Sequence, residues 1–119
     1  MSKILVADDA SFMRLMIRQI LSSQGHTEII EAQNGQVALE MFQAHRPDLT
    51  FLDITMPVRD GLSALSEILA IDPHAKVIMC TALCQDSVVK DALKLGALDF
   101  VIKPFRQHQF IETVNKYLS

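Results

Sequence analysis

Three aspartates, a threonine and a lysine stand where short apolar stretches of the sequence end. Asp8 and Asp9 follow the first stretch, and Asp53 follows the third. Thr81 follows the fourth stretch and Lys103 the fifth. Three carboxylates close together raise one another's pKa unless a cation joins them, and oxygen ligands suit Mg²⁺. A lysine can hold a phosphate, and a hydroxyl can donate to a phosphoryl oxygen. Together these groups suit phosphoryl transfer, which depends mainly on positioning and charge neutralisation.

Five apolar stretches alternate with five stretches of helical periodicity. Several of the apolar stretches lack polar alternation, which is typical of parallel strands buried on both faces. They are Ile4–Ala7, Ile29–Ile30, Leu49–Leu52, Val77–Cys80 and Phe100–Ile102. The helical pattern, with apolar residues three and four positions apart, occupies residues 13–21, 37–42, 62–69, 88–95 and 110–118. Strict alternation predicts an α/β fold, with a parallel sheet covered by helices on both faces.

Residues that cap or break helices mark the expected helix ends. Ser11 stands before the first helical stretch as the expected N-cap, and Gly25 follows it as a stop signal. The next three helices are expected to end before Pro47, Asp72–Pro73 and Gly96. Gly61 is expected to permit a turn before the third helix. Ligands of open α/β sheets bind outside the carboxyl ends of the strands, so the polar residues at those ends should share one rim.

Size, charge and hydropathy exclude several classes of protein. A chain of 119 residues suits one domain with a core of its own. Its formal net charge of −3 disfavours direct binding to nucleic acid. No stretch has the length of a membrane span or the form of a secretory signal. Cys80 and Cys84 lack the spacing of a zinc site and are expected to be free thiols in a reducing cytoplasm. The four histidines also lack ligand spacing and are expected at the surface.

Four motifs occur in order along the chain: ILVADDASFMR, DITMP, MCTAL and VIKPF. With them, residues 1–119 resemble the receiver domain of bacterial two-component response regulators, and within that family the single-domain, CheY-like chemotaxis regulators. The resemblance implies a flavodoxin-like (βα)5 fold, which is a doubly wound five-stranded parallel sheet with strand order 2-1-3-4-5. It also implies a phosphoacceptor switch that assists its own phosphorylation and dephosphorylation and is not an enzyme. Such a switch signals by phosphorylation-dependent binding of a partner, here with chemotaxis as the expected setting.

The resemblance implies a role for each residue of the predicted rim. Asp53 would be the nucleophile that becomes an acyl phosphate, and Lys103 would contact its phosphoryl group. Asp8, Asp9 and Asp53 would hold Mg²⁺. The backbone carbonyl of Thr55, two residues beyond the acceptor, would be a further metal ligand. The phosphoryl group would come from a histidine kinase or a histidine phosphotransfer domain.

A second set of positions matches the switching residues of the family. Thr81 would bond the phosphoryl group and shift on activation, and Phe100 matches the aromatic residue whose inward and outward positions report the state. Because Phe100 is not tyrosine, its switch has to act by packing alone. A cis peptide bond would join Lys103 to Pro104.

Two positions near the acceptor vary within the family pattern. Thr55 is neither an acid nor an amide, and Leu83 is apolar where many relatives carry polar groups. Neither is therefore expected to orient a hydrolytic water, so phospho-Asp53 should decay slowly. Comparing its decay with that of a variant carrying polar groups at both positions tests this expectation.

The resemblance also implies an output surface, made by the fourth helix, the fifth strand and the fifth helix. It would bind a downstream protein such as a flagellar motor switch. Lys90, Lys94 and Lys116 lie in those two helices, where a solvated face explains them equally well. The expected protein is a cytoplasmic monomer or weak dimer, without direct contact to nucleic acid or membrane.

Three alternatives stay open from the sequence. The first is a receiver domain excised from a larger regulator. The second is a Mg²⁺-dependent small-molecule phosphatase of the haloacid-dehalogenase kind, which places its nucleophile in a D-x-D motif after the first strand and carries a cap. Here Asp8 and Asp9 are adjacent, and no insertion is long enough for a cap. The third is a degenerate receiver that is not phosphorylated, which the intact set of rim residues disfavours.

Overall fold

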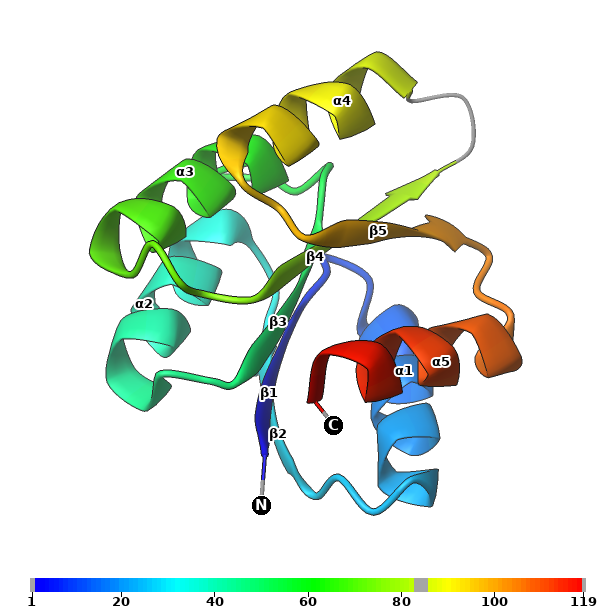
Figure 1. The fold of residues 1–119 in the computed structure, drawn as a ribbon. Coiled ribbons are helices and arrows are strands. Elements are labelled where there is room, and N and C mark those ends of the chain that lie inside the picture. Colours follow the sequence, from blue (N-terminus) through cyan, green and yellow to red (C-terminus); the bar gives the residue numbers. More distant parts are fainter. Residues whose placement is uncertain (1, 83–85, 119) are drawn as a thin grey trace.

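The computed structural model describes residues 2–82 and 86–118, and in these ranges strands and helices alternate strictly. Five parallel strands form one sheet in the order β2-β1-β3-β4-β5 (Figure 1). The strands are β1 (Lys3–Ala7), β2 (Glu28–Ala32), β3 (Leu49–Asp53), β4 (Val77–Ala82) and β5 (Asp99–Lys103). The predicted flavodoxin-like fold and its strand order are thereby confirmed.

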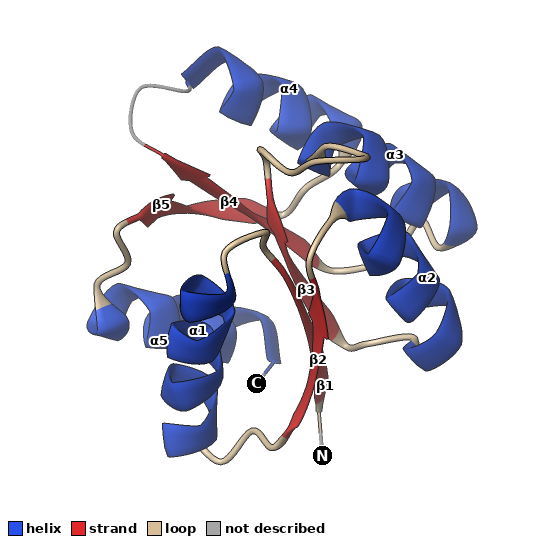
Figure 2. Cartoon of the chain, turned by 180° about the vertical axis from the view of Figure 1, so that it is seen from behind, coloured by secondary structure: helices blue, strands red, loops and turns tan. Residues whose placement is uncertain are grey.

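Helices cover both faces of the sheet. Two of them, α1 and α5, lie side by side on one face, and α2, α3 and α4 cover the other (Figure 1 and Figure 2). Their bounds are α1 (Ser11–Ser23), α2 (Gly35–His45), α3 (Gly61–Ile71), α4 (Asp86–Leu95) and α5 (Gln107–Leu118). Across the part of the chain that the structure describes, none of the helices combines the length and apolar character that a membrane crossing needs.

The position of each strand in the sheet explains its sequence pattern. The central strand β3 is buried at all five of its residues, since strands pair with it on both sides and helices cover both its faces. Such a strand reads as a continuous apolar run. The edge strand β5 alternates instead, with Val101 buried and both Phe100 and Ile102 exposed.

Strands β1, β2, β3 and β4 each contribute to two cores, because neighbouring residues point to opposite faces of the sheet, whereas β5 contributes Val101 to one of them. In β1, Val6 belongs to the core beneath α1 and α5, and Leu5 belongs to the core beneath α2, α3 and α4. In the first core the ring of Phe51 stacks on that of Phe110, with 4.6 Å between their centroids. This contact anchors α5 on the strand that ends in Asp53.

The start of α1 differs from the prediction. Ser11 is the first helical residue, and the N-cap is Ala10, whose side chain makes no capping hydrogen bond. The Asp8 carboxylate accepts a hydrogen bond from the Ala10 N–H at 2.9 Å, so the chain enters the helix one residue early. By contrast, α2 and α3 begin with side-chain caps. Asn34 and Asp60 each accept a hydrogen bond from the N–H three residues ahead, at 2.8 Å and 2.9 Å.

The hydroxyl of Thr50 is buried in the middle of β3 without a hydrogen bond. Thr50 is 1% exposed and is paired in register with Leu5 on one side and Val77 on the other. Among the described residues, its Oγ1 has no hydrogen-bond partner. A buried polar group left unpaired costs about 1–3 kcal/mol.

We therefore expect Thr50→Val to raise the free energy of unfolding by about 1 kcal/mol, because valine keeps the branched shape and removes the unpaired hydroxyl. Urea unfolding followed by circular dichroism measures the change. Thr50→Ala is the matched control, and it should lower the free energy of unfolding because it also leaves a cavity. A Thr50→Val protein less stable than the wild type would show that the hydroxyl is bonded in the folded state.

Candidate functional site

The carboxyl ends of β1, β3 and β5 bring together residues from distant parts of the sequence. Asp8 directly follows β1, Asp53 is the last residue of β3, and Lys103 is the last residue of β5. Asp8, Asp9 and Asp53 each offer a carboxylate oxygen, and these oxygens lie within 4.8 Å of one another. Asp8 and Asp53 are buried, with 1% and 6% exposed, whereas Asp9 is exposed. The three carboxylates of the predicted rim thus converge at one place.

The ammonium group of Lys103 bridges the two buried carboxylates. Its Nζ lies 2.6 Å from Oδ2 of Asp8 and 3.0 Å from Oδ2 of Asp53. Burial alone would lower the pKa of Lys103, but the hydrogen bonds to Asp8 and Asp53 outweigh burial and raise it. The ammonium is therefore charged at neutral pH. The peptide bond between Lys103 and Pro104 is cis.

The pKa of Asp53 is raised above the ordinary value of 3.8. Burial is the main cause, since it disfavours the charged form, and the nearby charge of Asp8 adds to it. The hydrogen bond and charge of Lys103 oppose this shift without cancelling it. The positive charge near Asp53 is therefore too small to offset the cost of burying its ionised form. A hard divalent cation such as Mg²⁺ would supply that charge, and the three carboxylates fit it because they offer only oxygen ligands.

The loop from β3 to α3 folds closely over the backbone of Asp53. A Cβ atom on Gly61 would lie 2.2 Å from the Asp53 carbonyl oxygen, so only glycine fits there. The Gly61 N–H donates to the Ile54 carbonyl at 2.8 Å. Gly61 lies directly before the body of the third helix, as expected, and glycine is required there by close backbone approach, since its φ is not positive. Within the same loop, the N–H of Thr55 lies 3.4 Å from Oδ1 of Asp53.

The end of β4 lies next to Asp53 in the sheet. Cys80 is paired with Asp53 in register, and burial raises the pKa of its thiol. The thiol is therefore protonated at neutral pH and does not compete as a nucleophile. Thr81 follows it, 3% exposed, and its hydroxyl donates to the Ala82 carbonyl at 3.1 Å. Leu83, singled out in the sequence, and Cys84 lie outside the described residues.

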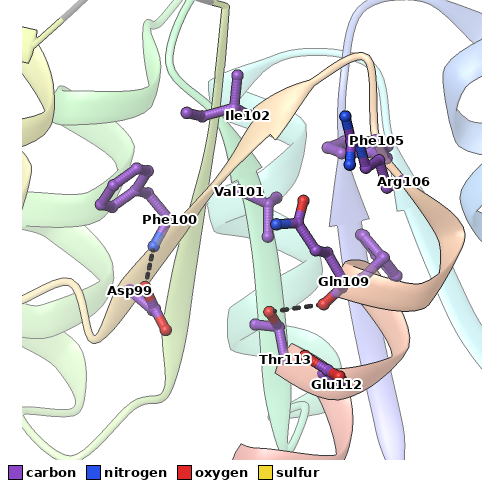
Figure 3. A pocket seen from close by; sticks show the side chains of 10 residues that line it. Asp99, Phe100, Val101, Ile102, Phe105, Arg106, Gln109, Glu112 and Thr113 are labelled. Carbon is purple, nitrogen blue, oxygen red and sulfur yellow. Dashed lines mark hydrogen bonds between the residues drawn. The ribbon is translucent and has the colours of Figure 1, made fainter.

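A pocket of about 280 Å³ lies between β5 and α5 (Figure 3). Apolar and polar side chains both line it, among them Val101, Phe105, Arg106, Gln109, Phe110 and Thr113. Phe100 and Ile102 point to the opposite side of β5 from Val101 and are 37% and 42% exposed (Figure 3). Because β5 ends in Lys103, one strand connects this surface with the carboxylates.

One contact at the site is not evident from the sequence. Nη1 of Arg14, a residue of α1, donates to the backbone carbonyl of Asp8 at 2.5 Å, and the Arg14 side chain is only 16% exposed. In the sequence, Arg14 falls on the polar side of the first helical pattern. That position predicts a solvated arginine and does not indicate a contact with Asp8. The sequence therefore predicts which carboxylates form the site, but not that the Arg14 side chain binds the backbone of Asp8.

Comparison with known proteins identifies the family. Residues 4–115 match the family model of the response regulator receiver domain. The chain is a member of this family. Chemotaxis protein CheY of Bacillus subtilis (strain 168) is 49% identical over 117 residues, which cover 98% of each chain. Protein CcdB of the same organism is 47% identical over 119 residues, covering 100% of this chain and 99% of that one.

The fold comparison agrees with the sequence comparison for this receiver domain. A crystal structure of the CheX–CheY–BeF3–Mg²⁺ complex from Borrelia burgdorferi contains a chain with a TM-score of 0.93 and 35% identity. The match covers 99% of this chain and 90% of that one. The receiver domain is a phosphoacceptor switch and not a catalytic enzyme, as the motifs predict. The alternative of a small-molecule phosphatase is therefore wrong.

In the metal-free receiver domain at pH 7, we expect Asp53→Asn to raise the free energy of unfolding. The pKa of Asp53 is higher in the folded than in the unfolded chain, so stability falls as pH rises from 3.8 through the folded value. Asparagine removes that loss. Urea unfolding in the presence of a chelator measures the gain, which should shrink as pH falls toward 3.8.

The control for this prediction is Asp91→Asn, which removes an exposed carboxylate of α4. It should change the free energy of unfolding by less than about 0.5 kcal/mol at either pH. A stability of Asp53→Asn at or below that of the wild type at pH 7 would contradict the raised pKa.

Proposed function

We propose that this receiver domain accepts a phosphoryl group on Asp53 from the phosphorylated histidine of a kinase or of a phosphotransfer domain. The observation that carries the proposal is the bridging contact of the Lys103 ammonium with Asp53 and Asp8, at 3.0 Å and 2.6 Å. Positive charge thus lies beside the side chain that would carry the phosphoryl oxygens. The membership of the chain in the receiver family supports the same role.

The proposed reaction is an in-line displacement at phosphorus. A carboxylate oxygen of Asp53 forms the new P–O bond while the P–N bond to the donor imidazole breaks, and the nitrogen keeps the electron pair of that bond. Lys103 would neutralise charge on the phosphoryl oxygens, and the Thr81 hydroxyl would donate a hydrogen bond to one of them. Catalysis by this chain is then mainly positioning and charge neutralisation.

Mg²⁺ is the cation that suits this site best, because it binds through one or two carboxylates, water and phosphate oxygens. Asp53 and the backbone carbonyl of Thr55 would hold it, and Asp8 and Asp9 would hold it directly or through water. When bound, it would supply charge neutralisation that the single ammonium of Lys103 leaves incomplete. The convergence of three carboxylate oxygens within 4.8 Å supports this assignment.

We propose that the output surface is the face made by α4, β5 and α5, and that it includes the pocket beside α5 (Figure 3). Phosphorylation would draw the Thr81 hydroxyl toward Asp53, and the Phe100 ring would move into the vacated space. Since Phe100 has no hydroxyl, the change would be read by packing alone. The exposed side chains of Phe100 and Ile102 offer apolar surface to a downstream protein.

Chemotaxis is the proposed setting, because CheY proteins of several organisms are 39–49% identical to this chain. The downstream protein would then be one such as a flagellar motor switch. The chain would act in the cytoplasm as a monomer or weak dimer, without binding nucleic acid directly. The alternative setting is a larger regulator of which this receiver domain forms part.

Slow loss of the phosphoryl group from Asp53 stays a prediction. It depends on Thr55, which is exposed, and on Leu83, which lies outside the described residues.

Incubation with Mg²⁺ and acetyl phosphate should add the mass of one phosphoryl group to the intact protein, as recorded by mass spectrometry. Asp53→Asn should gain nothing, and Asp91→Asn, which alters an exposed carboxylate of α4, should gain as the wild type does. Omitting Mg²⁺ should strongly reduce the gain. Failure of the wild type to gain mass from acetyl phosphate and from any histidine donor would favour the degenerate receiver instead.

A further inference from the structure

All four polar groups of Asp8 are held by partners within the protein. Its N–H donates to the Ala32 carbonyl at 3.0 Å, and its carbonyl accepts from Nη1 of Arg14 at 2.5 Å. Oδ1 accepts from the Ala10 N–H at 2.9 Å, and Oδ2 accepts from Lys103 at 2.6 Å. Among these four contacts, the hydrogen bond from Arg14 is made to the peptide group that joins Asp8 to Asp9.

The direction of the Asp8 carbonyl sets the plane of the peptide bond that leads to Asp9, because the peptide group is rigid. A change in the ψ angle of Asp8 that turned this carbonyl away from Arg14 would, unless the next φ angle compensated it, move the Asp9 side chain relative to the other two carboxylates. Asp9 is exposed, so packing alone does not hold it in place. A donor on the Asp8 carbonyl therefore controls the position of a carboxylate that it does not touch.

Arg14 is itself held in place by a second strand. Its Nε lies 3.1 Å from Oε1 of Glu31 in β2, while Nε of Arg18 donates to the other oxygen of that carboxylate at 2.8 Å. Burial alone would raise the pKa of Glu31, but the hydrogen bonds from Arg18 and Arg14 outweigh burial and lower it. Glu31 is therefore ionised at neutral pH and orients the Arg14 guanidinium toward the Asp8 backbone.

We propose that Arg14 is a positioning residue of the metal site, which orients the Asp8–Asp9 peptide so that both carboxylates meet the cation. The inference rests on the proposed function, in which Asp8 and Asp9 hold Mg²⁺. Arg14 acts through a backbone carbonyl and does not touch the metal. Side chains that orient the ligands of a metal in this way typically change its affinity by about 10-fold or more.

The sign of the effect separates this role from simple electrostatics. A guanidinium close to the site repels a cation, so removing its charge would tighten Mg²⁺ binding if charge alone mattered. Loss of positioning has the opposite effect, since it weakens binding although a positive charge has been removed. Arg18 offers a matched control because it lies on the same helix and binds the same carboxylate, but donates to the carbonyl of Ile29 instead of Asp8.

The experiment is a Mg²⁺ titration of the ¹⁵N-labelled protein, followed by the amide signals of residues 52–55 and 81. We expect Arg14→Met to weaken Mg²⁺ binding by roughly 10-fold, whereas Arg18→Met changes it by less than about 2-fold. Arg14→Lys should fall between Arg14→Met and the wild type, because one ammonium cannot reproduce the fork that serves Asp8 and Glu31 together. The dispersion of the spectra shows that each variant is folded.

Each outcome decides for or against the role of Arg14. Unchanged or tighter Mg²⁺ binding by Arg14→Met would overturn it, and so would equal weakening by Arg14→Met and Arg18→Met, which would indicate a general effect of the ion pair with Glu31. If the wild type itself shows no Mg²⁺-dependent shifts, the proposed metal site fails and the inference fails with it. The inference alone fails when the wild type binds Mg²⁺ and Arg14→Met binds it equally well.

Discussion

The functional site of this receiver domain depends on keeping two buried carboxylates beside each other, although their burial costs stability. Asp8 and Asp53 are almost fully enclosed, and each would repel the other and lose its hydration if nothing compensated them. The ammonium of Lys103 is within hydrogen-bond distance of both. It reaches them from the edge strand β5, across the end of β4, which is possible only because the strand order places β1, β3, β4 and β5 in succession.

Compensation of the buried charge of Asp53 is incomplete. Lys103 and the Thr55 N–H oppose the effect of burial without cancelling it, so the pKa of Asp53 stays raised. In the proposed function, Mg²⁺ would supply further positive charge. The backbone beside these carboxylates is also in close contact with the rest of the fold. Gly61 lets the loop after β3 pack directly on the Asp53 carbonyl, and Arg14 holds the Asp8 carbonyl from α1. Lys103 and the exposed Phe100 belong to the same strand, so β5 joins the carboxylate site to the surface that is proposed as the output face.

The sequence predicts the arrangement of strands and helices well because buried positions are occupied by apolar residues. The apolar run of residues 49–52 comes from the central strand, and strict alternation of strands and helices requires a parallel sheet. Because the carboxyl ends of parallel strands meet at one edge of the sheet, the sequence also predicts that Asp8, Asp53 and Lys103 lie together there. These features depend on periodicity and topology, both of which are visible along a single chain.

Other features depend on contacts between residues far apart in the sequence, and residue type alone does not reveal them. Ser11 has the chemistry of an N-cap, yet the Asp8 carboxylate accepts the Ala10 N–H and α1 begins one residue earlier. Gly61 is explained by the backbone it touches and not by its own φ. Arg14 looks like a solvated residue of a helix until β2 places Glu31 beside it.

The most direct test of this account is a titration of the Asp53 side-chain carboxyl carbon by ¹³C NMR, in the absence of metal and then with Mg²⁺. Burial beside Asp8, opposed by Lys103 and by the Thr55 N–H but not cancelled, predicts a midpoint above 3.8 in the metal-free protein. Addition of Mg²⁺ should move the midpoint down, because the cation favours the charged form. A metal-free midpoint at or below 3.8, unmoved by Mg²⁺, would contradict the claim that the Asp53 carboxylate lacks positive charge and that a cation provides it.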